Sequence, residues 1–242
     1  MPVRKPRGRK RPSHRRAYVS VLVLILLGAS TIAYVYLNGY FPLGGGSSTN
    51  TTNTSTPGCP APPLSDAGDV FACVRTSQGN FEVELFTNSA PKTVANFVGL
   101  ARAGFYNNLV WHRITTNPAV IQTGDPLTKN GRGDRSYWGT GGSNVTVPLE
   151  VSNTSLHNDR GYLGMARGQS INSGTSQFYI NTQDNRDLDG SYTVFGKVVS
   201  GMDVVDAIAA LPTYTNASAS YYEQPIDPSQ AMMNGITIIS GG

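Results

Sequence analysis

The sequence predicts a mainly β domain, folded as a closed antiparallel barrel that two helices cap, preceded by one N-terminal transmembrane helix. Two observations predict the barrel. Short strands separated by glycine-rich turns fill residues 109–200, and only two segments of the chain after its N-terminal region have helical periodicity. Many strands with two helices are typical of a capped barrel. A third observation, an uncharged apolar run near the N-terminus, predicts the membrane helix.

The clearest strands lie at the two ends of the predicted domain. Val70–Thr76 and Phe81–Phe86 alternate apolar and polar residues around Ser77-Gln78-Gly79-Asn80, which has the composition of a turn. Near the other end, Ile236–Ile239 has the composition of a final strand.

The first predicted helix opens at Pro91, with Ser89 as its candidate N-cap, and Gly104 closes it. Apolar residues recur on one face of this helix: Val94, Phe97, Val98 and Ala101. The second helix is expected from about Met202 to Ala210.

The basic residues of the chain are concentrated at its N-terminus. Residues 1–16 contain eight Lys or Arg and no acidic residue, which leaves 11 basic against all 15 acidic residues in the rest of the chain. Residues 17–37 follow, 21 residues without a charge. As a helix rising about 1.5 Å per residue this run spans roughly 30 Å, the thickness of the hydrocarbon core.

These charges predict a topology. A basic block before a membrane helix stays in the cytoplasm, so we expect a single-pass cell-membrane protein whose residues after Leu37 are extracytoplasmic. Because topology explains the basic tail, we expect no nucleic-acid partner. A cleaved signal peptide is the alternative, although its apolar core is normally shorter and ends at small residues.

Residues 38–65 form a Gly/Ser/Thr/Pro-rich linker, and residues 66–242 form the predicted domain. The chain has two cysteines, Cys59 and Cys73. Outside the cytosol they can pair, and closing a loop of about 15 residues would stabilise the fold by roughly 3 kcal/mol. Two unpaired thiols are the alternative.

Four motifs occur in a fixed order: Trp111-His112-Arg113, Gln122-Thr123-Gly124-Asp125-Pro126, Gln177-Phe178-Tyr179-Ile180, and the run Leu188–Val198. Together they resemble the cyclophilin family of peptidyl-prolyl cis-trans isomerases, over about residues 70–240. The resemblance implies an eight-stranded barrel, activity on X-Pro bonds in proline-containing client segments, a monomer, and no metal or cofactor.

The chemistry of such an enzyme needs one well-placed donor. The barrier of about 18–20 kcal/mol comes from amide resonance, so the enzyme must bind the twisted amide better than the planar forms. The resemblance implies that Arg113 stabilises the twisted amide and that Gln122 hydrogen-bonds the substrate carbonyl. It also implies that the following residues bind substrate: His112, Ala119, Val120, Met165, Ala166, Gln177, Tyr179, Leu188 and Tyr192.

The chain departs from the family pattern at several positions. Eight residues instead of seven separate Arg113 from Gln122, so the expected pocket phenylalanine becomes Ala119, a loss of about 1–3 kcal/mol of apolar contact. The family phenylalanine becomes Tyr179, whose hydroxyl needs a partner. Asp187 replaces the tryptophan associated with cyclosporin binding, and residues 213–233 are inserted. These departures keep open a non-catalytic binding module or holdase.

Overall fold

The computed structural model describes residues 70–240, a mainly β fold with two α-helices, α2 (Pro91–Arg102) and α3 (Met202–Ala209). The predicted basic tail, transmembrane helix and linker lie outside the described residues. Within residues 70–240 no helix has the length and apolar character needed to cross a membrane. The strands of the described part are β1 (Val70–Thr76), β2 (Gly79–Leu85), β3 (Leu109–Val110), β4 (Arg113–Thr116), β5 (Ala119–Thr123), β6 (Tyr162–Met165), β7 (Phe178–Asn181), β8 (Val194–Ser200) and β9 (Met232–Ser240).

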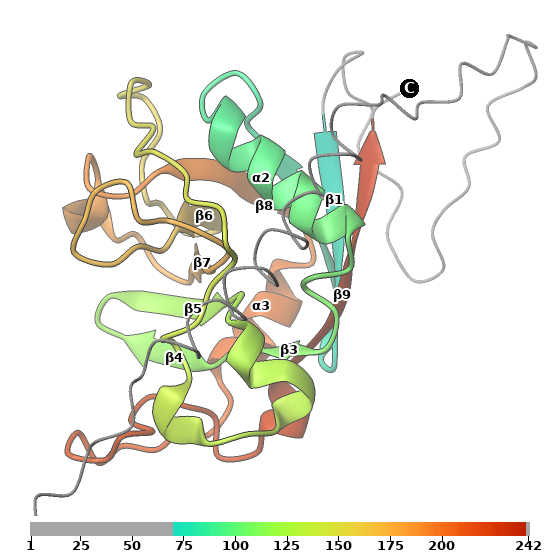
Figure 1. Cartoon of the computed structure of the whole chain (residues 1–242), viewed down its shortest axis with the longest axis vertical. Helices are drawn as coiled ribbons and strands as arrows, with labels where there is room; N and C mark the ends of the chain where they lie inside the picture. Colours follow the sequence, from blue (N-terminus) through green and yellow to red (C-terminus); the bar gives the residue numbers. More distant parts are fainter. Residues whose placement is uncertain (1–69, 241–242) are drawn as a thin grey trace, which may run out of the picture. The chain divides into compact units, whose positions relative to one another are not determined.

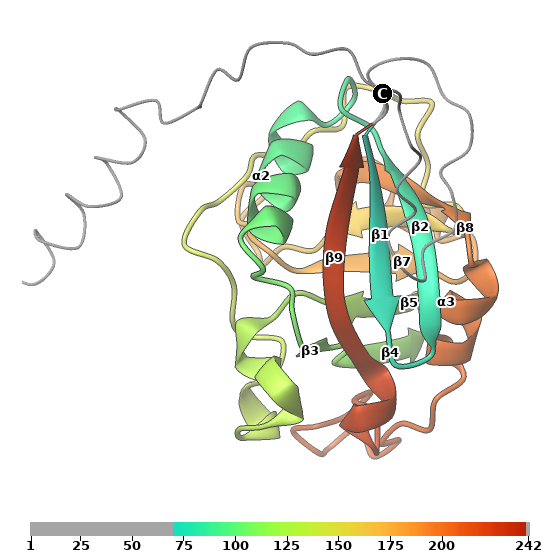
Figure 2. The ribbon, with the colours of Figure 1, turned by 90° about the vertical axis from the view of Figure 1, so that its right-hand side faces the viewer.

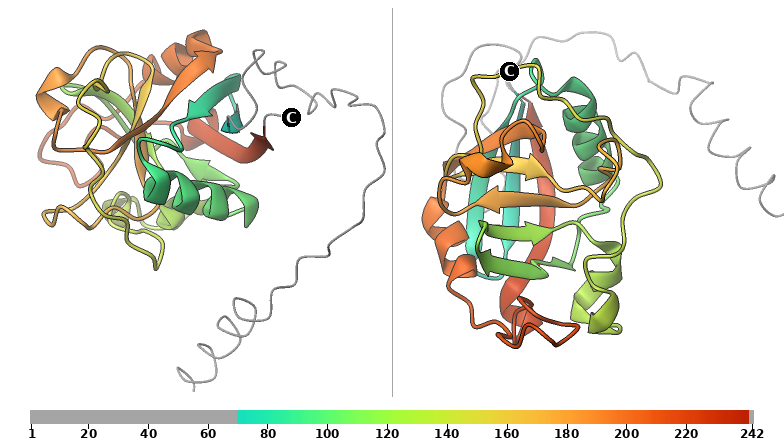
Figure 3. Two further views of the ribbon diagram at one scale, coloured as in Figure 1. Left: turned by 90° about the horizontal axis from the view of Figure 1, so that it is seen from above. Right: turned by 90° about the vertical axis from the view of Figure 1, so that its left-hand side faces the viewer.

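The strands form one antiparallel sheet in the order β3-β9-β1-β2-β8-β6-β7-β5-β4. Figure 2 shows β9, β1 and β2 side by side in front. The strands β7, β5 and β4 lie behind them and run across them at a steep angle. Helices α2 and α3 lie on opposite sides of this curled sheet, as the second view of Figure 3 also shows. The predicted strands β1, β2 and β9 and the predicted helices α2 and α3 are confirmed, each to within a few residues.

The prediction of a closed, eight-stranded barrel is wrong in its detail. The described residues contain a nine-stranded sheet whose two edges, β3 and β4, are not paired with each other. Only two residues separate these strands, but β3 pairs with β9 and β4 pairs with β5. The outer edge of β4 is occupied instead by a loop, because the N–H of Ile114 donates to the carbonyl of Glu223 at 2.9 Å.

Aromatic rings fill the interior between the two layers of the sheet. Phe97 from α2 packs on Phe178 from β7 and on Phe195 from β8, with ring centroids 5.4 Å apart in both pairs. Trp111 and Tyr106 extend the cluster, and all five side chains are fully buried. These rings set the distance between the helix and the strands that carry the groove described below.

The N-terminus of α2 is capped from far along the chain. The N–H groups of Lys92 and Thr93 donate to the carboxylate of Glu150 at 3.1 and 2.8 Å. The residue at the cap position is Ala90, whose side chain makes no capping bond. The prediction that Ser89 is the N-cap is therefore wrong. A carboxylate here also complements the positive end of the helix dipole.

Candidate active site

A groove of about 320 Å³ opens on the face of β4 and β5. It brings together eight of the eleven residues predicted to form the site: His112, Arg113, Val120, Gln122, Ala166, Tyr179, Leu188 and Tyr192. Their closeness follows from strand pairing. Arg113 lies directly opposite Gln122 in the β4–β5 ladder, and directly opposed residues of antiparallel strands project from the same face.

The other three predicted residues lie outside this lining. Gln177 lines an adjacent hollow that shares Gln122 and Ala166 with the groove, and Met165 lines a separate hollow beside Pro148. Ala119 is buried, with 5% of its surface exposed, and both its N–H and its carbonyl bond to the side-chain amide of Asn185.

Strand alternation explains why the placement of Ala119 needs correction. Successive side chains of a strand point to opposite faces, so Val120 and Gln122 face the groove while Ala119 and Ile121 face away from it. Pro118, which follows a cis peptide bond from Asn117, lines the groove at this end. An apolar proline ring therefore stands in the region where the sequence predicts a missing aromatic wall.

Gln122 is oriented by a chain of amide hydrogen bonds. Its Nε2 donates to Oε1 of Gln177 at 2.9 Å, and Nε2 of Gln177 donates to the carbonyls of Gly139 and Gly141 at 2.9 and 2.6 Å. A side-chain amide nitrogen carries two N–H donors, so Gln122 retains one for a carbonyl in the groove. Gln177 thus links the side chain of Gln122 to the backbone at Gly139 and Gly141.

Arg113 stands at the edge of the groove with 39% of its side chain exposed. Its Nε donates to Oε2 of Glu223 at 2.7 Å, the one ion pair that Arg113 makes within the described residues. Glu223 comes from residues 213–226, and Ser220, Tyr222 and Gln224 of the same segment line the groove. The sequence analysis identifies this segment as an insertion relative to the family pattern. The segment has no periodicity that would predict its contact with Arg113.

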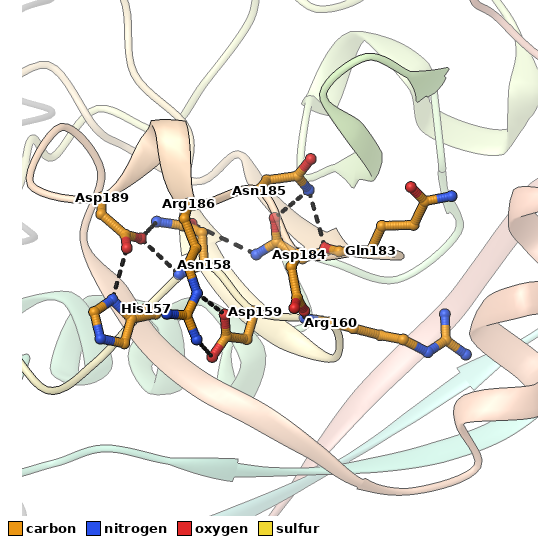
Figure 4. A network of polar contacts seen from close by, with 10 residues as sticks. His157, Asn158, Asp159, Arg160, Gln183, Asp184, Asn185, Arg186 and Asp189 are labelled. Carbon is orange, nitrogen blue, oxygen red and sulfur yellow. Dashed lines mark hydrogen bonds and ion pairs between the residues drawn. The ribbon is translucent and has the colours of Figure 1, made fainter.

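The added hydroxyl of Tyr179 has a partner. It donates to Oδ1 of the fully buried Asn158 at 2.7 Å, and Nδ2 of Asn158 donates to Asp189 at 3.0 Å. Nδ1 of His157 lies 2.6 Å from the same carboxylate (Figure 4). The network therefore joins one wall of the groove to the turn that carries Leu188.

Replacing Tyr179 with phenylalanine is expected to destabilise the fold by about 1–3 kcal/mol, because the buried Asn158 loses its short hydrogen bond. Chemical denaturation of the parent and the variant measures this difference. Tyr192→Phe is the matched control, since Tyr192 packs on Tyr179 at the partly exposed groove wall and should change stability less. Equal losses in the two variants would contradict the assignment.

His112 is buried, and burial lowers its pKa from 6.5 to about 4, while the carboxylate of Asp125 opposes the shift. The imidazole is therefore neutral at physiological pH. It serves as a wall of the groove and needs no proton transfer.

The same pKa predicts a pH dependence of stability. Between pH 6.5 and 4 the unfolded chain binds a proton that the folded His112 does not, so about 3 kcal/mol of stability present above pH 6.5 is lost as the pH falls to 4. Urea denaturation at several pH values measures the slope. His112→Gln should flatten it in this window, and an unchanged slope would show that other groups cause it.

The comparisons with known proteins agree with this geometry. A family profile described as cyclophilin type peptidyl-prolyl cis-trans isomerase/CLD matches residues 71–228. The chain is 40% identical over 152 residues to a peptidyl-prolyl cis-trans isomerase-like 1 of Aspergillus niger, a match over 63% of this chain and 85% of that protein. It is 42% identical over 143 residues to a peptidyl-prolyl cis-trans isomerase-like 2 of Rhizopus delemar, but spans 25% of that longer protein.

Among solved structures, the chain is similar to a cyclophilin type peptidyl-prolyl cis-trans isomerase of Cryptosporidium parvum determined in the presence of the dipeptide Ala-Pro. The TM-score is 0.60 at 28% identity, over 70% of this chain and 99% of that one. The family profile covers well over half of the chain, and the groove holds the predicted arginine and glutamine side by side. This chain belongs to the cyclophilin-type peptidyl-prolyl cis-trans isomerase family.

Proposed function

We propose that this enzyme accelerates the isomerisation of X-Pro bonds in extracytoplasmic proteins, and that Arg113 does so by stabilising the twisted amide. The observation that carries the proposal is the pairing of Arg113 with Gln122 across β4 and β5, above the apolar walls of the groove. Neither role needs a nucleophile, a metal or a cofactor.

In this mechanism the prolyl ring lies against the apolar part of the groove, near Val120, Leu188 and the ring of Tyr179. Gln122 donates its remaining N–H to the substrate carbonyl and fixes one side of the rotating bond. As the amide twists, the prolyl nitrogen regains a lone pair. The guanidinium of Arg113 then donates to it, an interaction that neither planar form offers.

The test is isomerisation of an Ala-Pro-containing peptide, followed by NMR exchange with the purified full chain in detergent. Acceleration of a step that otherwise takes tens to hundreds of seconds supports the proposal. Peptide binding without any acceleration would instead favour the alternative, a non-catalytic binding module or holdase.

The location of the enzyme is part of the proposal. The basic block at residues 1–16 and the uncharged run at residues 17–37 support anchoring in the cell membrane with the isomerase domain outside. We also propose that the enzyme is a monomer. Clients are therefore expected among exported proteins with proline-containing segments.

Protease added to intact cells is expected to release the isomerase domain by cutting between Asn38 and Ser65, because the proposed topology places this segment outside. Immunoblotting of the medium detects the released domain. A cytoplasmic marker protein must stay intact in the same sample. Protection of the domain until the cells are lysed would reverse the orientation.

A further inference from the structure

Residues 213–226, which we call the cover loop, lie along the edge of β4 (Figure 1). Ser220, Tyr222 and Gln224 of this loop line the groove. The loop folds back on itself: the N–H of Glu223 donates to the carbonyl of Tyr214 at 2.9 Å, and the N–H of Tyr214 donates to the carbonyl of Gln224 at 3.0 Å. These bonds give the loop a defined shape of its own.

The cover loop is also fixed to its surroundings through Arg135. Nη2 of Arg135 donates to the carbonyl of Pro225 at 2.5 Å, and its guanidinium stacks on the rings of Trp138 and Tyr214, 4.9 and 5.4 Å from their centroids. Nε2 of Gln224 donates back to the carbonyl of Arg135 at 2.8 Å. The loop is thus held from both sides, on β4 and on the segment around Arg135.

Glu223 is the residue through which this loop contacts the reaction site. Its carbonyl accepts from Ile114, one carboxylate oxygen accepts from Nε of Arg113 at 2.7 Å, and the other accepts from Oγ1 of Thr115 at 2.9 Å. The carboxylate is mostly buried, with 17% of the side chain exposed. Two fixed hydrogen bonds leave it little rotational freedom.

The backbone of Glu223 is unusual as well. Its φ of +63° lies in the left-handed region, which a residue with a long side chain rarely adopts. A conformation of this kind persists only when the surroundings determine it, and such residues concentrate at functional sites. In Glu223 this backbone conformation coincides with the carboxylate placed against Arg113.

We propose that Glu223 is a positioning residue that holds Arg113 in its reactive orientation. The proposal rests on the isomerase function proposed above. The carboxylate contacts Nε, so both terminal nitrogens of the guanidinium stay available to the groove. A guanidinium held at Nε presents its terminal donors in one plane, whereas an unheld arginine samples many rotamers. The cover loop would then supply a part of the active site.

The first test replaces Glu223 with alanine and with glutamine in the full chain. Glu223→Ala is expected to slow isomerisation about 10- to 100-fold at nearly unchanged peptide affinity, because the guanidinium loses its fixed orientation. Glu223→Gln should recover most of the rate, since the amide can still accept from Nε of Arg113. Glu84→Ala, which removes an ion-paired glutamate on β2, is the matched control and should leave the rate unchanged.

Two further measurements separate positioning from a general loss of structure. The Nε–Hε resonance of Arg113 should be shifted and protected from exchange in the parent and in Glu223→Gln, and should lose both properties in Glu223→Ala. In an Arg113→Ala background, adding Glu223→Ala should slow the reaction no further. An additive loss would assign Glu223 a structural role and overturn the proposal.

The remaining outcomes also decide the question. A rate in Glu223→Ala equal to or above that of the parent would overturn positioning, and an increase would mean that Glu223 restrains Arg113. If Glu223→Ala fails to fold, Thr115→Val removes the second anchor of the carboxylate and should produce a smaller loss in the same direction. An inactive parent would instead refute the proposed function itself, which is a distinguishable result.

Discussion

Replacing Arg113 with alanine is expected to slow prolyl isomerisation about 10²–10³-fold while peptide affinity changes little. The guanidinium is proposed to donate to the prolyl nitrogen only when the amide is twisted, so its loss raises the barrier without removing ground-state contacts. NMR exchange measures the rate, and titration of the same peptide measures the affinity. The difference between the two effects is the signature of transition-state stabilisation.

Two variants sharpen this experiment. Arg113→Lys should recover little activity, because an ammonium is a point charge that cannot reproduce the planar donor and cannot keep the Nε bond to Glu223. Arg167→Ala removes another arginine that lines the groove and is expected to slow the reaction far less. A well-folded Arg113→Ala variant with the parent rate would refute the mechanism.

Replacing Phe178 with alanine is expected to destabilise the domain by about 3–5 kcal/mol, the largest stability effect we anticipate from a single change. Phe178 is fully buried and its ring contacts four other aromatic rings, with centroids between 5.4 and 6.3 Å. Truncation leaves a cavity that rings attached to four different segments cannot close. Urea denaturation followed by circular dichroism measures the change.

Phe178→Leu keeps most of the volume and should cost clearly less than the alanine variant. Tyr137→Ala is the surface control: this aromatic side chain is 61% exposed, so its removal should change stability by no more than about 0.5 kcal/mol. Because Phe178 is the direct sequence neighbour of Gln177 and Tyr179, its loss should also weaken peptide binding. A Phe178→Ala variant as stable as the surface control would show that the cluster does not hold the core.

The elements that sequence reasoning places correctly are those with a local signal. Alternation identifies β1 and β2, and a repeating apolar face with an early proline identifies α2. The grouping of Arg113 with Gln122 came from the family resemblance, and strand register accounts for it physically. The β4–β5 ladder runs without a register shift from Arg113 opposite Gln122 to Thr116 opposite Ala119.

The features that the sequence leaves unpredicted depend on contacts between distant segments. Glu150 caps α2 from 58 residues away, and Glu223 reaches Arg113 across 110 residues. Neither contact leaves a pattern in the neighbouring sequence. The prediction of a closed barrel is wrong because the number of strands does not reveal whether the two edge strands pair. In the structure β3 and β4 do not pair, and the carbonyl of Glu223 accepts from the N–H of Ile114 on β4 instead.

The position of β9 has a consequence for biosynthesis. This strand lies between β3 and β1, so these two strands acquire their shared partner only when residues 232–240 have been made. Until then β1 and β3 each expose an unpaired edge. Pairings over such sequence separations form slowly, and exposed edges invite intermolecular association. We therefore expect the nascent chain to be most prone to aggregation before residues 232–240 emerge and pair with β1 and β3.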